Sequence, residues 1–355
     1  MTKENHTTFS GFVVLGYSEL PDLQGLLFVV FLFIYASILT GNGLIIYVTL
    51  TDPTLYTPMY FFLKNLSLLE ICYTSVTLPK MLVNLIAENK NISFIGCAAQ
   101  IYFLLLLGGT ECLLLAAMAY DRYVAICNPL HYKLIMSKQF CWGLVTGSLT
   151  VNMPAHVGQT YLVFTLPFCD SHEINNFFCD IPPLLELACA DTNINKVTVF
   201  VASTVFIIIP FFLILPSYVK IISAIMKMHS AENRKKVFST CSSHLIIVSL
   251  FYGSGTIVCM TPRSKEIVGI NKFLSLFYTI LVPMFNPIIY SLRNREVKSS
   301  LRKFLLQWLT RNAHLAPFIV VVVVTWLRIG FWETFREEVL NASSQAEHKT
   351  KPNIL

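Results

Sequence analysis

Two carboxylic acids lie inside long apolar stretches of this chain. Glu70 interrupts the hydrophobic run that follows Pro58, and Glu111 interrupts the run that opens near Ala98. An ionisable group in such surroundings is costly, and it therefore indicates a functional site. If the two acids met in one low-dielectric site, they could not both stay bare anions, and a shared proton or a cation would be required. The alternative is that each acid is satisfied separately.

A second group of charged and phenolic residues ends the run that carries Glu111. Residues 118–132 read Met-Ala-Tyr-Asp-Arg-Tyr-Val-Ala-Ile-Cys-Asn-Pro-Leu-His-Tyr, so Asp121, Arg122 and Tyr123 stand where hydrophobic sequence gives way to polar sequence. Such groups belong at a membrane surface. An ion pair with Asp121 can hold the planar, permanently charged guanidinium of Arg122 in one position. The alternative is that Arg122 only anchors a helix to lipid headgroups.

Other reactive residue types form no recognisable catalytic or metal-binding pattern. His, Ser and Cys occur in the apolar runs, but spacing alone supports no pair of nucleophile and base. His244 lies on an apolar face with no partner at metal-ligand spacing, which is more typical of a helix-contact histidine. We therefore predict that the protein is not an enzyme.

The ten cysteines fall into two groups according to their positions in the chain. Six lie in or beside the apolar runs, whereas Cys97, Cys169, Cys179 and Cys189 fall in expected extracellular loop. Four loop cysteines allow three pairings, and the residues alone leave the choice open.

The composition indicates that these residues are positioned by membrane-spanning helices. Hydrophobic residues make up 55% of the 355-residue chain, charged residues make up 13%, and the mean hydropathy is +0.62. An average soluble domain carries about 25% charged residues. We expect one polytopic domain with spans of about 20 residues each. No Lys/Arg-rich run of the kind that tracks phosphates occurs, so a nucleic-acid partner is not expected.

The basic residues predict the orientation of the spans. Across a seven-span arrangement they gather on one side, which is the cytoplasmic side by the positive-inside rule. The N-terminus then lies outside, where the glycosylation sequon at Asn5, and a second one at Asn91, could be used. The first apolar run has no cleavage signal before it, so we expect it to act as an uncleaved signal.

The chain after the last span is predicted to form two segments. Apolar residues repeat at helical spacing between basic ones in residues 293–310, which indicates an amphipathic helix lying on the membrane. Residues 311–355 form an atypical C-terminal extension, and its apolar run is shorter than a transmembrane helix usually requires. The expected division is therefore an extracellular N-terminus (1–24), a seven-span domain (25–292), the amphipathic helix (293–310) and the extension (311–355).

Several motifs closely resemble those of the olfactory receptors, a family of rhodopsin-like (class A) G-protein-coupled receptors. They are the stretch at 118–132, Leu-Tyr-Thr-Pro-Met-Tyr at 55–60, Lys-Val-Phe-Ser-Thr-Cys-Ser-Ser-His-Leu at 236–245 and Pro-Met-Phe-Asn-Pro-Ile-Ile-Tyr at 283–290. The resemblance covers roughly residues 9 to 310, and within the family it favours the tetrapod-type branch. It implies an all-α fold, a seven-transmembrane helix bundle followed by a short amphipathic cytoplasmic helix.

The resemblance also implies roles for individual residues. It pairs Cys97 with Cys179, and Cys169 with Cys189, and it places Glu70 and Glu111 around a central polar pocket with Asn42 and Asn286. Its ligand pocket maps onto Leu104, Leu105, Gly108, Gly109, Cys112, Ala202, Ser203, Phe206, Tyr252, Gly255, Thr256, Cys259, Tyr278 and Thr279. Its switch and G-protein-coupling residues map onto Asp121, Arg122, Tyr123, Tyr218, His244, Asn286, Pro287 and Tyr290.

The expected function is that of an odorant receptor. The pocket residues are apolar with a few hydroxyls and no obvious counter-charge, which suits a neutral hydrophobic volatile. Binding would activate a stimulatory, olfactory-type G protein and raise cyclic AMP, in cilia of olfactory sensory neurons. A class A receptor for another small ligand outside the nose is the alternative, and a transporter or channel is less favoured because no internal repeat is found. No cofactor is expected beyond a structural cation near Glu70 and Glu111, and membrane lipids are the remaining partners.

Overall fold

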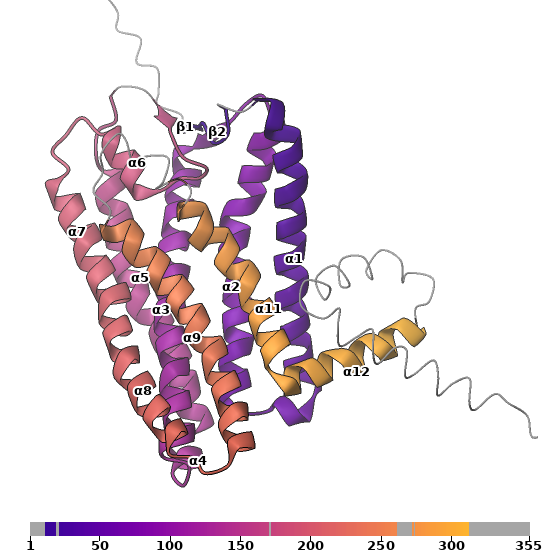
Figure 1. Cartoon of the computed structure of the whole chain (residues 1–355). Coiled ribbons are helices and arrows are strands. Elements are labelled where there is room, and N and C mark those ends of the chain that lie inside the picture. Colours follow the sequence, from indigo (N-terminus) through magenta and orange to yellow (C-terminus); the bar gives the residue numbers. More distant parts are fainter. Residues whose placement is uncertain (1–10, 19–20, 170–171, 261–271, 273, 312–355) are drawn as a thin grey trace, which may run out of the picture.

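The computed structural model describes residues 11–18, 21–169, 172–260, 272 and 274–311 of the chain. Long helices run side by side through one bundle, with short loops at its two ends (Figure 1). The helices are α1 (Gln24–Thr51), α2 (Pro58–Ile86), α3 (Phe94–Cys127), α5 (Lys138–Phe164), α7 (Asn193–Ser203) continued by η3 (Thr204–Ile208) and α8 (Ile209–Met226), α9 (Ala231–Met260), and η5 (Phe277–Leu281) continued by α11 (Val282–Arg293).

Length and composition mark four helical stretches of the described residues as able to cross a membrane. They are Pro21–Thr51, Pro58–Ile86, Phe94–Cys127 and Asn193–Met226. The most apolar window of the Phe94–Cys127 stretch is 61% buried, against 17% for Pro21–Thr51. Helix α3 is therefore enclosed by its neighbours, whereas α1 presents most of its apolar surface outward.

Local sequence explains where several helices begin. The Ser93 hydroxyl accepts a hydrogen bond from the Gly96 amide at 3.0 Å and caps α3. Ser137 caps α5 in the same way through the Phe140 amide. Both side chains satisfy an amide that has no partner within its own helix. Pro58 opens α2, where its missing N–H costs no helical hydrogen bond.

Two π-helical turns precede prolines in the helices that face the centre of the bundle. η3 ends just before Pro210, and η5 ends just before Pro283. A proline cannot donate the backbone hydrogen bond of an ordinary helical turn, and a wider turn accommodates the missing donor. The sequence analysis predicted no π-helical turn at either position.

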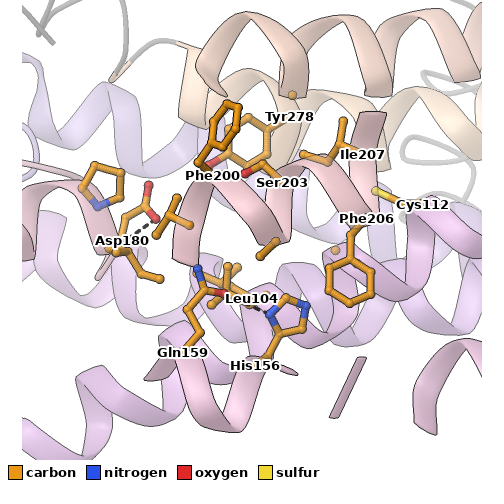
Figure 2. Close-up of a pocket in the computed structure, with 18 of the residues that line it drawn as sticks. Leu104, Cys112, His156, Gln159, Asp180, Phe200, Ser203, Phe206, Ile207 and Tyr278 are labelled. Atoms are coloured by element: carbon orange, nitrogen blue, oxygen red, sulfur yellow. Dashed lines mark hydrogen bonds between the residues drawn. The ribbon is translucent and has the colours of Figure 1, made fainter. Parts of the chain in front are cut away.

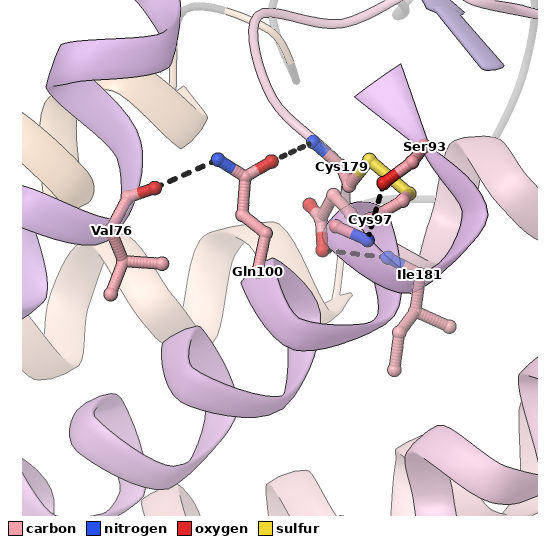
Figure 3. The surroundings of a disulfide bond; sticks show 8 residues. Val76, Ser93, Cys97, Gln100, Cys179 and Ile181 are labelled. Atoms are coloured by element: carbon pink, nitrogen blue, oxygen red, sulfur yellow. Dashed lines mark hydrogen bonds between the residues drawn. A yellow bond between two sulfur atoms is a disulfide. The ribbon is translucent and has the colours of Figure 1, made fainter. Parts of the chain in front are cut away.

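A three-stranded sheet and two disulfides cover one end of the bundle, which we call the disulfide end. Strand β1 (Gly11–Val14) lies between β2 (Asn91–Ser93), to which it is antiparallel, and β3 (Glu173–Ile174), to which it is parallel. The structure joins Cys97 to Cys179 and Cys169 to Cys189, which is the pairing that the resemblance implied. The first disulfide holds the loop between α5 and α7 onto the start of α3 (Figure 3).

The opposite end of the bundle carries α4 (Tyr132–Ile135), and we call it the α4 end. From there α12 (Arg295–Arg311) leaves the bundle at a sharp angle to α11 (Figure 1). Its start is held by hydrogen bonds: the Tyr60 hydroxyl lies 2.7 Å from Glu296 Oε2, and the Ser300 hydroxyl donates to Asp52 Oδ2 at 2.6 Å. The predicted extension and the sequon at Asn5 lie outside the described residues.

Candidate functional site

A cavity of about 410 Å³ lies in the half of the bundle nearer the disulfide end, a volume typical of small-molecule sites. Helix α3 contributes Leu104, Leu105, Gly108 and Gly109, and the π-helical turns contribute Phe206, Ile207 and Tyr278. Figure 2 shows the side chains of Leu104, Phe206, Ile207 and Tyr278 converging on one space. The loop between α5 and α7 covers it through α6 (Ile181–Glu186) and the residues just before it.

The covering loop is fixed to α3 by more than its disulfide. Gln100 of α3 accepts a hydrogen bond from the Cys179 amide at 2.9 Å and donates one to the Val76 carbonyl of α2 at 2.8 Å (Figure 3). Asp180 then caps α6 by accepting from the Ile181 amide at 2.8 Å. The lid of the cavity is therefore tied to two helices beneath it.

One wall of the cavity is polar and comes from α5. His156 is 3% exposed and Gln159 is 6% exposed, and both line the cavity. His156 Nδ1 lies 3.3 Å from the side-chain amide of Gln159, and Nε2 lies 3.1 Å from Asn152 Oδ1. Figure 2 shows the imidazole and the amide of Gln159 joined at the edge of the space.

Gly109 allows α5 to approach α3 at this wall. A Cβ atom added at Gly109 would lie 2.2 Å from Asn152 Oδ1 and 3.0 Å from His156 Nε2. Neither distance is compatible with a side chain, so the absence of a Cβ permits the polar wall to pack against α3. At Gly108 the nearest atom, Cε2 of Tyr73, would be 3.7 Å away, which is an ordinary contact.

Most of the predicted pocket residues line this cavity. They are Leu104, Leu105, Gly108, Gly109, Cys112, Ala202, Ser203, Phe206, Gly255 and Tyr278. Tyr252, Thr256 and Thr279 are not part of the lining, and the side chain of Cys259 lies outside the described residues. Tyr252 is buried and donates from its hydroxyl to the Cys112 carbonyl at 2.6 Å, so it supports a lining residue.

Several polar residues of the cavity lining were not predicted from the sequence. They are His156 and Gln159 of α5, Asp180 of the covering loop and Lys196 of α7. The pocket was predicted to hold no obvious counter-charge, but Asp180 and Lys196 bring one charge of each sign to its lining. The available signal was polar residues three and four apart, Asn152, His156 and Gln159, in an otherwise apolar helix.

The two membrane-depth acids meet below the cavity. Glu70 and Glu111 are both 0% exposed, and their carboxyl groups are close enough to interact electrostatically. Asn286 of α11 donates a hydrogen bond to Glu70 Oε1. Glu70 Oε2 and both oxygens of Glu111 have no hydrogen-bond partner within the described residues. Asn42 is 1% exposed, and its side chain donates to the Ile38 carbonyl of its own helix.

The residues predicted to form the switch gather at the α4 end. Asp121 accepts a hydrogen bond from the Tyr132 hydroxyl at 2.9 Å, and no ion pair with Arg122 is found among the described residues. The reason is geometric, since adjacent residues on a helix point in different directions. Arg122 is 9% exposed, and its Nε has no hydrogen-bond partner in the described part of the chain.

Tyr218 of α8 is joined to α9. Its hydroxyl hydrogen bonds to His244 Nδ1, and the two rings stack with centroids 5.9 Å apart. Tyr123 lies on the neighbouring surface of α3, with Lys220 Nζ 5.4 Å from its ring centroid. The side chain of Tyr290 lies outside the described residues.

Comparison with known proteins connects this architecture to a family. A family model described as olfactory receptor matches residues 31–308. The chain belongs to the olfactory receptor family. It is 52% identical over 299 residues to human Olfactory receptor 10AG1, a match that covers 84% of this chain and 99% of that relative. Human Olfactory receptor 10A7 is 49% identical over 307 residues, covering 86% and 97%. Mouse Olfactory receptor 5AP2 is 48% identical over 305 residues, covering 85% and 95%.

Membership of the olfactory receptor family confirms the predicted fold class. The family consists of seven-transmembrane G-protein-coupled receptors, so the bundle of Figure 1 spans the plasma membrane several times. It is a receptor family and not an enzyme class. The family match ends at residue 308, before the predicted extension.

Proposed function

We propose that this olfactory receptor binds a small, neutral, hydrophobic volatile in the cavity nearer the disulfide end. The observation that supports the proposal is a cavity of about 410 Å³ lined by Leu104, Phe206 and other apolar residues from several helices. Small apolar ligands fit such a site by burying surface, while a few polar groups set their orientation. Asp180 and Lys196 bring opposite charges to the lining, so they favour neither an acid nor an amine.

We further propose that binding activates a stimulatory, olfactory-type G protein and raises cyclic AMP. The G protein would bind at the α4 end, where Arg122 and His244 lie. Basic residues such as Lys133, Lys138 and Lys227 gather there, which supports a cytoplasmic assignment for this end. The N-terminus would then be extracellular, with Asn5 available for glycosylation, and the receptor would work in cilia of olfactory sensory neurons.

A cyclic-AMP reporter screen of the whole chain against a broad panel of neutral volatiles tests the proposed function. At least one volatile is expected to raise cyclic AMP in cells that display the receptor. Ala202→Phe, which fills the cavity, should abolish that response, whereas Val201→Phe on the exposed side of the same helix should retain it. Equal responses in the two variants would show that the ligand binds elsewhere.

The paired acids carry a second proposal, that Glu70 and Glu111 share a proton or a cation. The unpartnered carboxylate oxygens and the amide of Asn286 are groups that a hard cation prefers. Replacing both acids by Gln is expected to alter surface expression or basal signalling. A sodium titration of the melting temperature against choline chloride distinguishes the two cases, because only a bound cation gives a sodium-specific increase. A double variant that matched the parent receptor in both assays, in every salt, would contradict the shared site.

A further inference from the structure

We propose that this receptor selects ligands that carry a hydroxyl group, and that Gln159 accepts the hydrogen bond from that hydroxyl through its side-chain carbonyl oxygen. The inference rests on the proposed function, because it names the class of volatile that the same cavity takes. It follows from a chain of hydrogen bonds along α5 that begins below the cavity and ends at its wall. The chain runs from Ser148 through Asn152 and His156 to Gln159.

The first link fixes the orientation of the Asn152 amide. Asn152 Nδ2 donates to the Ser148 carbonyl at 2.6 Å, and both residues are buried. Turning this amide over would place two oxygen atoms at that distance, with no proton between them. Asn152 Oδ1 therefore faces His156, where it lies 3.1 Å from Nε2.

The second link fixes the tautomer of His156. Because Asn152 Oδ1 can only accept, Nε2 must carry the proton. A neutral imidazole has one N–H, so Nδ1 is left as an acceptor. A doubly protonated ring would bury a charge against two neutral amides, and the described residues place no carboxylate in hydrogen-bonding contact with it. The neutral ring with its proton on Nε2 is therefore the favoured form.

The third link fixes the orientation of the Gln159 amide. His156 Nδ1 lies 3.3 Å from the end of this amide that Figure 2 draws as oxygen. An acceptor nitrogen needs a donor there, and the two ends of an amide have the same shape, so the hydrogen-bond network decides between them. The NH₂ group faces His156, and the carbonyl oxygen is left for the cavity that Gln159 lines.

A buried carbonyl oxygen on an apolar wall favours a ligand that can donate to it. An alcohol or a phenol supplies that donor, whereas an aldehyde, ketone or ether of the same skeleton presents only acceptors. A site built to hydrogen bond a hydroxyl rejects the analogue that lacks one, because its own polar group is then left unpaired. The receptor should therefore distinguish molecules of almost equal size and hydrophobicity.

Matched odorants test this selectivity in the cyclic-AMP assay. The probes are quartets with one skeleton each, such as octanol, octanal, octyl methyl ether and octanoate, or benzyl alcohol, benzaldehyde, benzyl methyl ether and benzoate. In every quartet that activates the receptor, the alcohol is expected to be roughly tenfold more potent than the ether or the aldehyde. The carboxylate should be inactive or weak.

Two substitutions separate hydrogen bonding from packing. Gln159→Leu should lower the potency of the alcohol to that of its ether and leave the ether unchanged. Asn152→Ala removes the acceptor that fixes His156, so the imidazole can donate from Nδ1 and the Gln159 amide can present its NH₂ group to the cavity. That variant is expected to shift the preference from the alcohol toward the aldehyde. Thr146→Val is the matched control, because this exposed hydroxyl on α5 donates to the Trp142 carbonyl of its own helix and does not line the cavity.

Each outcome decides the inference. Equal potency of alcohol and ether in the unmodified receptor, or equal losses for both in Gln159→Leu, would overturn it while leaving the proposed function intact. No response to any volatile from receptor that is present at the cell surface would overturn the proposed function itself. Should Asn152→Ala fail to reach the surface, the ranking in the unmodified receptor and in Gln159→Leu still decides.

Discussion

At the scale of single residues, a missing side chain is as important to the cavity as those that line it. Gly109→Ala would place a Cβ atom 2.2 Å from Asn152 Oδ1, and the buried Asn152 has little room to move. We expect the overpacked crossing of α3 and α5 to lose about 1–3 kcal/mol of stability. Surface expression should fall, and the melting temperature of purified receptor should decrease.

Gly108→Ala is the matched control for this prediction. It adds the same methyl group one position earlier, where the nearest atom would be 3.7 Å away. Its melting temperature should stay close to that of the parent receptor. Similar losses in the two variants would mean that alanine disturbs α3 in general and that the close approach at Gly109 is not limiting.

In the sequence, single residues could be singled out where a motif or a charge marked them. Glu70 and Glu111 stood out as acids in apolar runs, and the structure brings them together with Asn286. His156 and Gln159 were not predicted, because polar residues at helical spacing within a span also occur as contacts between helices. Only the crossing at Gly109 and the cavity beside it show that these two face a ligand site.

At the scale of elements, one of the side-chain hydrogen bonds that hold α12 to the α4 end can be tested alone. The Ser300 hydroxyl bond, assisted by Thr54, lowers the pKa of Asp52 to about 2. In an unfolded chain the pKa of an aspartate side chain is about 3.9. Because the folded value is the lower one, the ionised carboxylate stabilises the fold above about pH 4, and that contribution is lost as the pH falls through about 2.

Ser300→Ala should therefore lower the melting temperature slightly at neutral pH and not at all in strong acid. The loss is at most on the order of 0.5 kcal/mol, because Asp52 is only partly buried and water screens its carboxylate. Ser299→Ala, an exposed neighbour on the same helix, provides the control. A difference between the two variants that stayed constant down to the acid limit would rule out Asp52 as the partner.

Periodicity and hydropathy predicted the helices. They did not predict β-strands whose pairing partners are distant in the chain. The predicted seven-span domain begins at residue 25, and α1 begins at Gln24. The sheet of β1, β2 and β3 was not predicted, since its short strands come from separate parts of the chain. The π-helical turns η3 and η5 were not predicted either, because their sequences are as apolar as those of ordinary helical turns.

At the scale of the whole molecule, α3 connects the ligand cavity to the α4 end. Its first half lines the cavity, its middle carries Glu111, and its last turns carry Asp121 and Arg122. Helix α9 offers a parallel route, with Tyr252 bonded to the cavity residue Cys112 and His244 bonded to Tyr218. A volatile that favours a different spacing of α3 and α9 can therefore change the contacts at the far end.

We predict that Arg122 is part of the switch that responds to a changed spacing of α3 and α9. It is nearly enclosed, its Nε has no hydrogen-bond partner within the described residues, and Tyr218 is bonded to His244 in this arrangement. We expect an outward movement of α9 to separate Tyr218 from His244 and to bring its phenol into contact with Arg122. The volatile can shift that equilibrium only by its differential affinity for the two arrangements, which for so small a ligand is at best a few kcal/mol.

Arg122→Ala distinguishes a switch from a lipid anchor. As a switch, the variant should reach the cell surface and bind the volatile but lose at least about tenfold in odorant-evoked cyclic AMP, since the arrangement that binds G protein is no longer stabilised. As an anchor, it should lose surface protein first. Lys133→Ala is the matched control, because this exposed cation at the α4 end should matter only for contact with headgroups. Full odorant-evoked signalling from well-expressed Arg122→Ala receptor would exclude the switch.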